Sequence, residues 1–190
     1  MPTKAKITTE MVINAGFNLV KENGWEGVNA RKVANYLGCS TQPIYSCFLN
    51  MESLKQEIIK KATSVYDEYI KNYSSVKTNK KYLQFGLAYI MFAKQEKNLF
   101  KLLFMRDRQN EVVSQQMQDS NLNLILTTIS EKLNISKEKA YNIHLHMWVF
   151  THGIASMIAT NYVNFTFEQI EGLLINQFNL VQQNLNKENN

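Results

Sequence analysis

The sequence predicts an all-α protein of about nine helices, and three observations support that class. Its 190 residues include only seven Gly and two Pro, too few for a sandwich or barrel, which needs a turn about every 8–12 residues. Hydrophobic residues make up 45% and charged residues 19%, a balance typical of folded domains. Apolar residues recur mainly at helical spacing. The length suits one large domain or two small ones.

Two short helices are predicted at the amino-terminal end of the chain. Apolar residues at i, i+3, i+4, i+7 and i+8 predict a helix over 9–23, capped by Thr8 or Thr9. A second helix is expected over 30–37, with Asn29 as its N-cap and a glycine directly after it.

A third short helix and a long fourth helix follow. Ser40 is placed to cap a helix over 41–47, with Pro43 in its first turn, where the missing N–H has no partner in any case. Asn50 is placed to cap a helix over 50–73. Asn98 and Ser136 are expected to cap two of the remaining helices, which are predicted over 81–95, 98–106, 111–133, 137–161 and 166–186.

The stretch 140–167 contains no Asp, Glu, Lys or Arg, yet it does not predict a membrane span. It carries His144, His146 and His152 together with asparagines, and about 20 apolar residues crossing a bilayer would not tolerate so many polar groups. We therefore expect a buried helix of a soluble protein and no membrane partner.

Charge and cysteine content indicate a cytoplasmic protein whose basic half is amino-terminal. The net charge is +5, and residues 1–108 carry 17 basic and 9 acidic side chains against 4 and 7 in residues 109–190. Cys39 and Cys47 alone cannot form a disulfide framework, and no apolar run at the amino terminus suits a signal peptide. No cofactor motif is present.

The spacing of Ala34, Gly38 and Ile44 is the helix-turn-helix pattern. A small residue is needed where the helices cross, a glycine suits the sharp turn, and Ile44 anchors the next helix in the core. A plain helical hairpin can show the same spacing. The residues left to face outward carry mostly short neutral donors, which suit close approach to base edges in a major groove; they are Ser40, Thr41, Gln42, Tyr45, Ser46 and Cys47.

At this point the sequence resembles the tetracycline-repressor (TetR) family of transcriptional regulators, densely over about the first 55 residues. The matching residues are Val12-x2-Ala15-Gly16-x2-Leu19-Val20, Gly24-Trp25-x2-Val28-Asn29-x-Arg31-x-Val33-Ala34, Leu37-Gly38-Cys39-Ser40-x4-Tyr45-x2-Phe48 and Leu54.

The resemblance implies a helix-turn-helix DNA-binding domain at 1–50 and a helical ligand-sensing and dimerisation domain at 51–190. It implies that Arg31 reaches a base or phosphate, that Thr41 and Gln42 touch bases, and that the Tyr45 hydroxyl grips a phosphate. Lys6, with Lys4, lies in a short arm suited to neutralising phosphates. The implied partners are a double-stranded DNA operator, a second copy of the chain and a small-molecule effector that releases the repressor.

Two positions depart from the family pattern. Met51 stands where a lysine is frequent, and Cys47 stands where His, Tyr or Arg is frequent. The DNA-facing surface is therefore expected to be unusually neutral, with binding that depends less on salt.

Beyond residue 56 the resemblance is thinner. Trp148-x3-His152-Gly153 is similar to a Trp-His-Gly element found in a subset of the family. The aromatic residues of this half suggest a pocket for an apolar or aromatic ligand, with these ligand-binding candidates: Tyr66, Tyr69, Tyr89, Phe104, Trp148 and His152. The last helix carries two apolar stripes, more than one protomer core can cover, and the dimer-interface candidates are Phe167, Leu173, Leu174, Phe178, Leu180 and Val181.

Other interpretations are weaker. His144 and His146 point about 200° apart on a helix, which disfavours a metal site, and Cys47 has no basic neighbour in sequence that would make it a redox switch. An enzyme is disfavoured because no catalytic motif is visible. A helical adaptor that binds protein rather than DNA stays open as the rival class.

Overall fold

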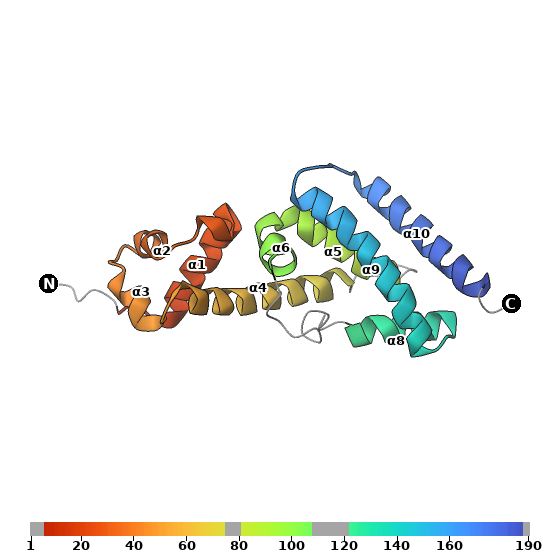
Figure 1. Ribbon diagram of the computed structural model, residues 1–190, viewed down its shortest axis with the longest axis horizontal. Helices are drawn as coiled ribbons and strands as arrows, with labels where there is room; N and C mark the ends of the chain where they lie inside the picture. The colour runs from red at the N-terminus through yellow and green to blue at the C-terminus, as the bar shows by residue number, and fades with distance from the viewer. Residues whose placement is uncertain (1–5, 75–80, 108–121, 188–190) are drawn as a thin grey trace. The chain divides into compact units, whose positions relative to one another are not determined.

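The computed structural model describes residues 6–74, 81–107 and 122–187, and in these ranges the chain is helical with no strand (Figure 1). The all-α prediction is confirmed. The described residues form nine α-helices and one 3₁₀ turn, η1 (Trp25–Gly27), which lies between the first two helices. The α-helices are α1 (Thr9–Asn23), α2 (Ala30–Tyr36), α3 (Gln42–Cys47), α4 (Met51–Ser74), α5 (Lys81–Gln95), α6 (Lys97–Phe104), α8 (Leu122–Leu133), α9 (Lys137–Ala159) and α10 (Phe167–Lys187). The predicted segment 111–121 lies outside the described residues.

The chain forms two compact units. The first contains the described residues up to Val65 together with Glu96–Arg106, and the second contains Tyr66–Gln95 together with the described residues from Asp107 onward. α4 therefore contributes its first part to one unit and its last part to the other. The functional boundary at residue 50 stays a prediction.

The helix-turn-helix spacing folds as expected in the first unit. Ala34 is 2% exposed and Ile44 1% exposed, so both are core residues of the packed helices α1, α2 and α3. Gly38 has a φ of +64°, the left-handed region that favours glycine, and the turn it makes separates α2 from α3.

Most predicted N-caps are confirmed. The side chains of Thr8, Asn29 and Ser136 accept hydrogen bonds from backbone N–H groups in the first turns of α1, α2 and α9. At α4, Asn50 Oδ1 accepts from the Ser53 N–H at 2.8 Å, and the Asn50 N–H donates to the Ser53 hydroxyl at 3.3 Å. This reciprocal pair satisfies two otherwise unpaired donors.

Two predicted caps are wrong. The N-cap of α3 is Thr41 rather than Ser40, and its backbone is already near-helical at φ −74° and ψ −16°, which leaves it without a side-chain cap bond. α6 begins at Lys97, so Asn98 lies inside the helix, where its Nδ2 donates to the Lys21 carbonyl at 2.8 Å. Asn98 therefore satisfies a carbonyl at the end of α1 instead of capping α6.

α6 is part of the first unit and packs against α1. Besides the Asn98 bond, Lys21 pairs with Glu96 at 2.8 Å. Leu99 and Phe100 are fully buried. The long helix α4 also joins this core through Leu54 and Ile58, both 0% exposed.

In the second unit, α9 packs against α5, α8 and α10 (Figure 1). Its buried face includes Ile143, Met147, Ile154 and Ile158. Within the described part of the chain, no helix is both long and apolar enough to cross a bilayer.

Candidate functional site

The first candidate site is the outer surface of α3. Burial of Ile44 fixes this short helix and directs the rest of it away from the core. Tyr45 is 55% exposed. Of the other residues predicted to face outward, Ser40, Gln42 and Ser46 are exposed, and Thr41 and Cys47 are half-buried.

The hydroxyl of Ser46 donates to the Gln42 carbonyl at 3.0 Å. This bond uses the hydrogen of Ser46 and leaves its oxygen lone pairs as acceptors. The exposed surface of α3 thus offers an amide, a phenol hydroxyl and a serine oxygen, groups that can read base edges or bind phosphate oxygens.

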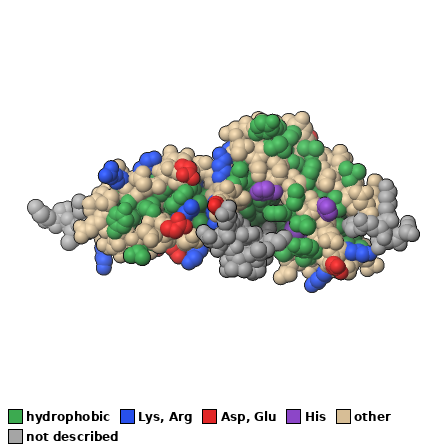
Figure 2. Space-filling model, in the orientation of Figure 1, with side chains coloured by type: hydrophobic (Ala, Val, Ile, Leu, Met, Phe, Trp, Pro, Cys, Tyr) green, Lys and Arg blue, Asp and Glu red, His purple; other side chains and the backbone are tan. Residues whose placement is uncertain are grey.

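Cationic side chains in the first unit lie outside α3. Lys6 is exposed before α1, and Arg31 is exposed in the first turn of α2; Lys4 lies outside the described residues. Lys32, which sequence reasoning did not single out, is exposed beside Arg31. Figure 2 shows basic and acidic side chains interspersed on the visible face, without a single-sign patch.

The start of α4 carries an apolar residue, Met51, at the position where TetR-family sequences often have a lysine. Met51 is half-buried and the preceding Leu49 is 89% exposed. Lys55, one turn further on, lies over the Trp25 ring with Nζ 5.0 Å from its centroid. Cation–π contact of this kind stabilises the folded unit by roughly 0.5–1 kcal/mol at exposed sites.

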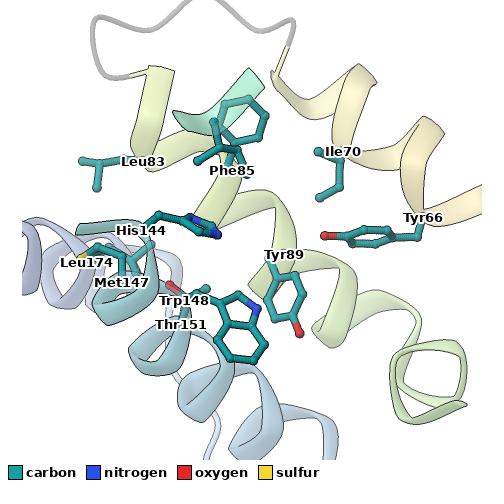
Figure 3. A pocket seen from close by; sticks show the side chains of 12 residues that line it. Tyr66, Ile70, Leu83, Phe85, Tyr89, His144, Met147, Trp148, Thr151 and Leu174 are labelled. Atoms are coloured by element: carbon teal, nitrogen blue, oxygen red, sulfur yellow. The ribbon is translucent and has the colours of Figure 1, made fainter. Parts of the chain in front are cut away.

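The second candidate site is a cavity in the second unit (Figure 3). The space between its lining residues, including the part that is open to solvent, amounts to about 520 Å³. Helices α4, α5, α8, α9 and α10 all contribute side chains, and aromatic and aliphatic groups predominate. The lining residues are Tyr66, Ile70, Leu83, Phe85, Gly86, Tyr89, Ile125, His144, Met147, Trp148, Thr151 and Leu174.

Among the described residues that line the cavity, none is Asp, Glu, Lys or Arg. Its polar groups are the His144 ring, the Thr151 hydroxyl, the Trp148 indole N–H and the hydroxyls of Tyr66 and Tyr89. In Figure 3 the Tyr66 hydroxyl points toward the interior of the cavity, whereas the Tyr89 hydroxyl points away from it. A charged ligand would lose hydration here without a paired charge in the wall, so the lining favours an uncharged molecule.

Three of the six ligand-binding candidates line this cavity: Tyr66, Tyr89 and Trp148. Tyr69 does not; its hydroxyl donates to Gln95 Oε1 at 3.1 Å. Phe104 belongs to the first unit, where its ring contacts Phe100.

His152, the sixth candidate, also stands outside the lining. Its Nδ1 lies 2.9 Å from the Tyr89 hydroxyl oxygen, and its ring stacks on Trp148 with centroids 5.8 Å apart. Burial lowers the pKa of His152 below its ordinary value, because the charged imidazolium would be poorly solvated there.

Most of the cavity wall was not anticipated from the sequence. A signal exists around Trp148: His144, Met147, Trp148 and Thr151 stand at i, i+3, i+4 and i+7, which is one helix face. On α5 the lining residues Leu83, Phe85, Gly86 and Tyr89 stand at i, i+2, i+3 and i+6. Such a pattern also marks ordinary core, so spacing alone does not locate a cavity.

The other candidates from the sequence are the histidines and cysteines considered for metal binding or redox chemistry. His144 lines the cavity while His146 is exposed, as their opposite directions on α9 predict. Among the described residues, no group of three or more His, Cys, Asp or Glu is arranged to hold a metal ion. Cys39 and Cys47 are free thiols, both half-buried.

The residues of α10 that are predicted to form the dimer interface differ in how much of each is exposed to solvent. Leu174, Phe178 and Val181 are 1%, 9% and 7% exposed, so they pack inside the single chain. Phe167 and Leu180 are 43% and 55% exposed. Leu173 is half-buried.

Exposed apolar residues also occur on the neighbouring helix α9. Trp148 and Val149 are 42% and 58% exposed, and the following turn carries Gly153, whose added Cβ would meet none of the described atoms within 4 Å. The surfaces of α9 and α10 therefore include large hydrophobic side chains that are exposed in the single chain.

A helix-turn-helix unit joined by α4 to a helical unit with an apolar cavity defines the architectural class. Solved structures with this architecture include a TetR family protein from Vibrio parahaemolyticus, at 15% identity and a TM-score of 0.59, covering 90% of this chain and 97% of that one. A TetR-like transcriptional regulator from Rhodococcus sp. RHA1 is similar at 12% identity and a TM-score of 0.66, covering 93% and 94%. These likenesses show that the chain has the fold of TetR-like regulators.

Among curated proteins, the HTH-type transcriptional regulator YobS of Bacillus subtilis strain 168 is 20% identical over 177 residues, covering 92% of this chain and 88% of its own. A search of protein families returned no matching family model.

Proposed function

We propose that this protein is a TetR-type transcriptional regulator that binds double-stranded DNA as a homodimer and is released from it by a small apolar or aromatic ligand. The observation that carries the proposal is the first unit: Ala34, Gly38 and Ile44 hold α3 so that its polar side chains face solvent. The TetR-type regulators with the same fold support it.

The outer face of α3 enters a major groove in this proposal. Gln42 reads a base, for which its amide suits adenine, and Tyr45 binds a phosphate. Ser40, Thr41, Ser46 and Cys47 complete the face, with Lys6 and Arg31 contacting the backbone or an adjacent base.

Fluorescence anisotropy with DNA flanking the protein's own gene tests the DNA contacts proposed for α3. Tyr45→Phe should weaken binding to all sequences by about 1 kcal/mol, the value of one hydrogen bond. Gln42→Ala should instead relax preference at one base position in each half-site, worth about 1–3 kcal/mol. Gln56→Ala is the matched control, because Gln56 is exposed on α4 and bonds Glu52. Equal effects of Tyr45→Phe and Gln42→Ala at every site would exclude Gln42 as a base reader.

The neutral surface gives this regulator a weak salt dependence. Met51→Lys should add one phosphate contact and steepen the slope of log affinity against log salt by about 0.9. An unchanged slope would show that residue 51 does not approach a phosphate.

The dimer is built from α9 and α10, using the side chains that one protomer leaves exposed or half-buried, including Phe167, Leu173 and Leu180. Glutamate at Leu173 or Leu180 should yield monomers, because a charge would be desolvated in the interface. Leu124→Glu is the control, since Leu124 is 56% exposed on α8. An unchanged dimer mass by light scattering would refute the assignment.

Ligand release acts through α4. This helix begins three residues after Phe48, runs 24 residues to Ser74, about 36 Å at 1.5 Å per residue, and supplies Tyr66 and Ile70 to the cavity. A ligand that tilts α4 changes the spacing of the two α3 helices, which must enter successive major grooves. By linkage, DNA must weaken ligand binding by the same factor. Calorimetric titration with and without operator tests this: equal affinities would refute release, and tighter binding with DNA would indicate a corepressor.

A further inference from the structure

His152 does not line the cavity, but it contacts two residues that do, Tyr89 and Trp148. It is on α9, one turn after Trp148, and it reaches across to Tyr89 on α5. The hydrogen bond to the Tyr89 hydroxyl spans 2.9 Å, and the Trp148 and His152 rings are stacked with an interplanar angle of 24°. One imidazole therefore contacts two aromatic residues that do line the cavity.

The orientation of Tyr89 affects more than its own position. Tyr89 is 6% exposed, and its ring meets Tyr66 edge-on, with centroids 6.2 Å apart. Tyr66 in turn lies edge-on to Phe92 at 5.2 Å. Fixing the Tyr89 hydroxyl thus fixes the first of a series of packed rings, two of which, Tyr89 and Tyr66, form the cavity wall.

We propose that His152 is a positioning residue for the cavity: it holds Tyr89 by a hydrogen bond and Trp148 by stacking in the orientation that the ligand meets, without touching the ligand itself. This inference rests on the proposed ligand-binding function of the cavity. It assigns His152 a role different from the direct ligand contact expected from the sequence.

The chemistry of the ring suits this role. A neutral imidazole presents one ring nitrogen as an acceptor and the other as a donor, so Nδ1 can accept the hydrogen of the Tyr89 hydroxyl. The half-buried setting favours the neutral form. Holding aromatic walls in place before binding improves affinity because less side-chain freedom is lost when the ligand enters.

Two substitutions separate the two contacts. His152→Asn keeps an acceptor close to the position of Nδ1 but has no ring to stack on Trp148. His152→Phe keeps a ring and has no acceptor for Tyr89. His146→Asn and His146→Phe are the matched controls, because His146 is exposed on the same helix and does not line the cavity.

The probe is N-phenyl-1-naphthylamine, an uncharged aromatic dye whose emission rises in apolar surroundings. His152→Phe should weaken its binding about fivefold, the effect of one lost hydrogen bond. His152→Asn should weaken it about twofold to tenfold, the range of one lost aromatic contact. The two His146 variants should bind the dye as the unsubstituted protein does.

A double-mutant cycle tests whether His152 acts through Tyr89. Tyr89→Phe removes the hydroxyl and keeps the ring in the wall. Because both changes break the same bond, His152→Phe should add little to Tyr89→Phe. Fully additive losses would mean that His152 contacts the dye directly, and would overturn the positioning role.

The ligand-free protein gives a second readout. In a Trp25→Phe background, Trp148 is the sole tryptophan, and its near-ultraviolet circular dichroism should change in His152→Asn and not in His146→Asn. Equal spectra in these two variants would overturn the stacking role of His152.

Blocking variants distinguish failure of this inference from failure of the proposed function. Gly86→Leu and Leu83→Phe each add bulk to the wall and should abolish dye binding. If they do, but every His152 variant binds the dye as the unsubstituted protein does, the positioning role is overturned and the cavity remains the site of the dye. If they leave dye affinity unchanged, the cavity is not the dye's site and the ligand-binding proposal fails; the ligand-free spectra then decide the role of His152 alone.

Discussion

A methyl group added at Gly86 should stabilise the protein while weakening ligand binding. Gly86 lies in the interior of α5 and lines the cavity. A Cβ built there would lie 3.4 Å from Leu174 Cδ1 and 3.5 Å from Thr151 Oγ1. These are ordinary to slightly tight van der Waals distances, so alanine fits without displacing the backbone.

The magnitude follows from two contributions. Replacing glycine by alanine in a helix interior gains about 1 kcal/mol, and burying one methyl group gains up to about 0.8 kcal/mol. The tight contact to Leu174 offsets part of this, so Gly86→Ala should raise the free energy of unfolding by about 1 kcal/mol. For a chain of this size, that corresponds to a rise in Tm of about 2–4 °C.

Ligand affinity should move the other way. The same methyl group occupies space that a bound molecule would use, and overpacking costs about 1 kcal/mol or more. Dye binding should therefore weaken at least about fivefold. Thermal unfolding and dye titration of one preparation measure both quantities. A destabilised Gly86→Ala, or one that binds the dye as tightly as the unsubstituted protein, would refute the cavity geometry.

Gly172→Ala is the control for helix propensity. Its Cβ would meet no atom of the described residues within 4 Å, so only the gain of about 1 kcal/mol is expected. A loss of stability at this position would instead indicate that a partner chain packs against α10.

Three further predictions concern the turn, a cap and pH. Gly38→Ala should cost about 1–2 kcal/mol in thermal unfolding from backbone strain alone, because φ is +64° and its Cβ would meet no atom of the described part of the chain within 4 Å; an unchanged Tm would contradict this. Asn50→Ala should cost about 1 kcal/mol in urea unfolding by removing the α4 cap; an unchanged urea midpoint would show that the cap contributes nothing. The pKa of His152 is lowered in the folded state, so the unfolded chain binds more protons, and stability should fall as pH drops through and below about 6.5; His152→Asn should flatten this decline, and an equal decline in both proteins would contradict it.

Helix positions were largely predictable because their determinants are local. The cap at Asn50 and the apolar face beyond it predict a helix over 50–73, and the structure has Met51–Ser74. Similarly, Ser136 marks the start of α9, whose observed range is Lys137–Ala159 against a predicted 137–161. Periodicity and caps are read from residues within one or two turns.

Features that depend on tertiary partners were not predictable in this way. Asn98 reads as a cap from its neighbours, yet its side chain donates to the Lys21 carbonyl, 77 positions earlier. Likewise, the apolar residues of α10 form stripes in the sequence, but only packing decides that Leu174 is buried while Leu180 is exposed. His152 and Tyr89 are 63 positions apart, and no local pattern pairs them.

The residues that fold the first unit differ from those proposed to read DNA. Val33, Ala34 and Ile44 are at most 2% exposed, so substitutions there act on stability through cavities or overpacking. Gln42 and Tyr45 are exposed, and exposed substitutions usually change stability by no more than about 0.5 kcal/mol. Under the proposed function, selection can therefore change the preferred operator by altering the outer face of α3 while the inner face keeps the crossing angle. A strong sequence signature for the fold consequently carries little information about the operator sequence, because the signature resides largely in the buried residues and the proposed specificity in the exposed ones.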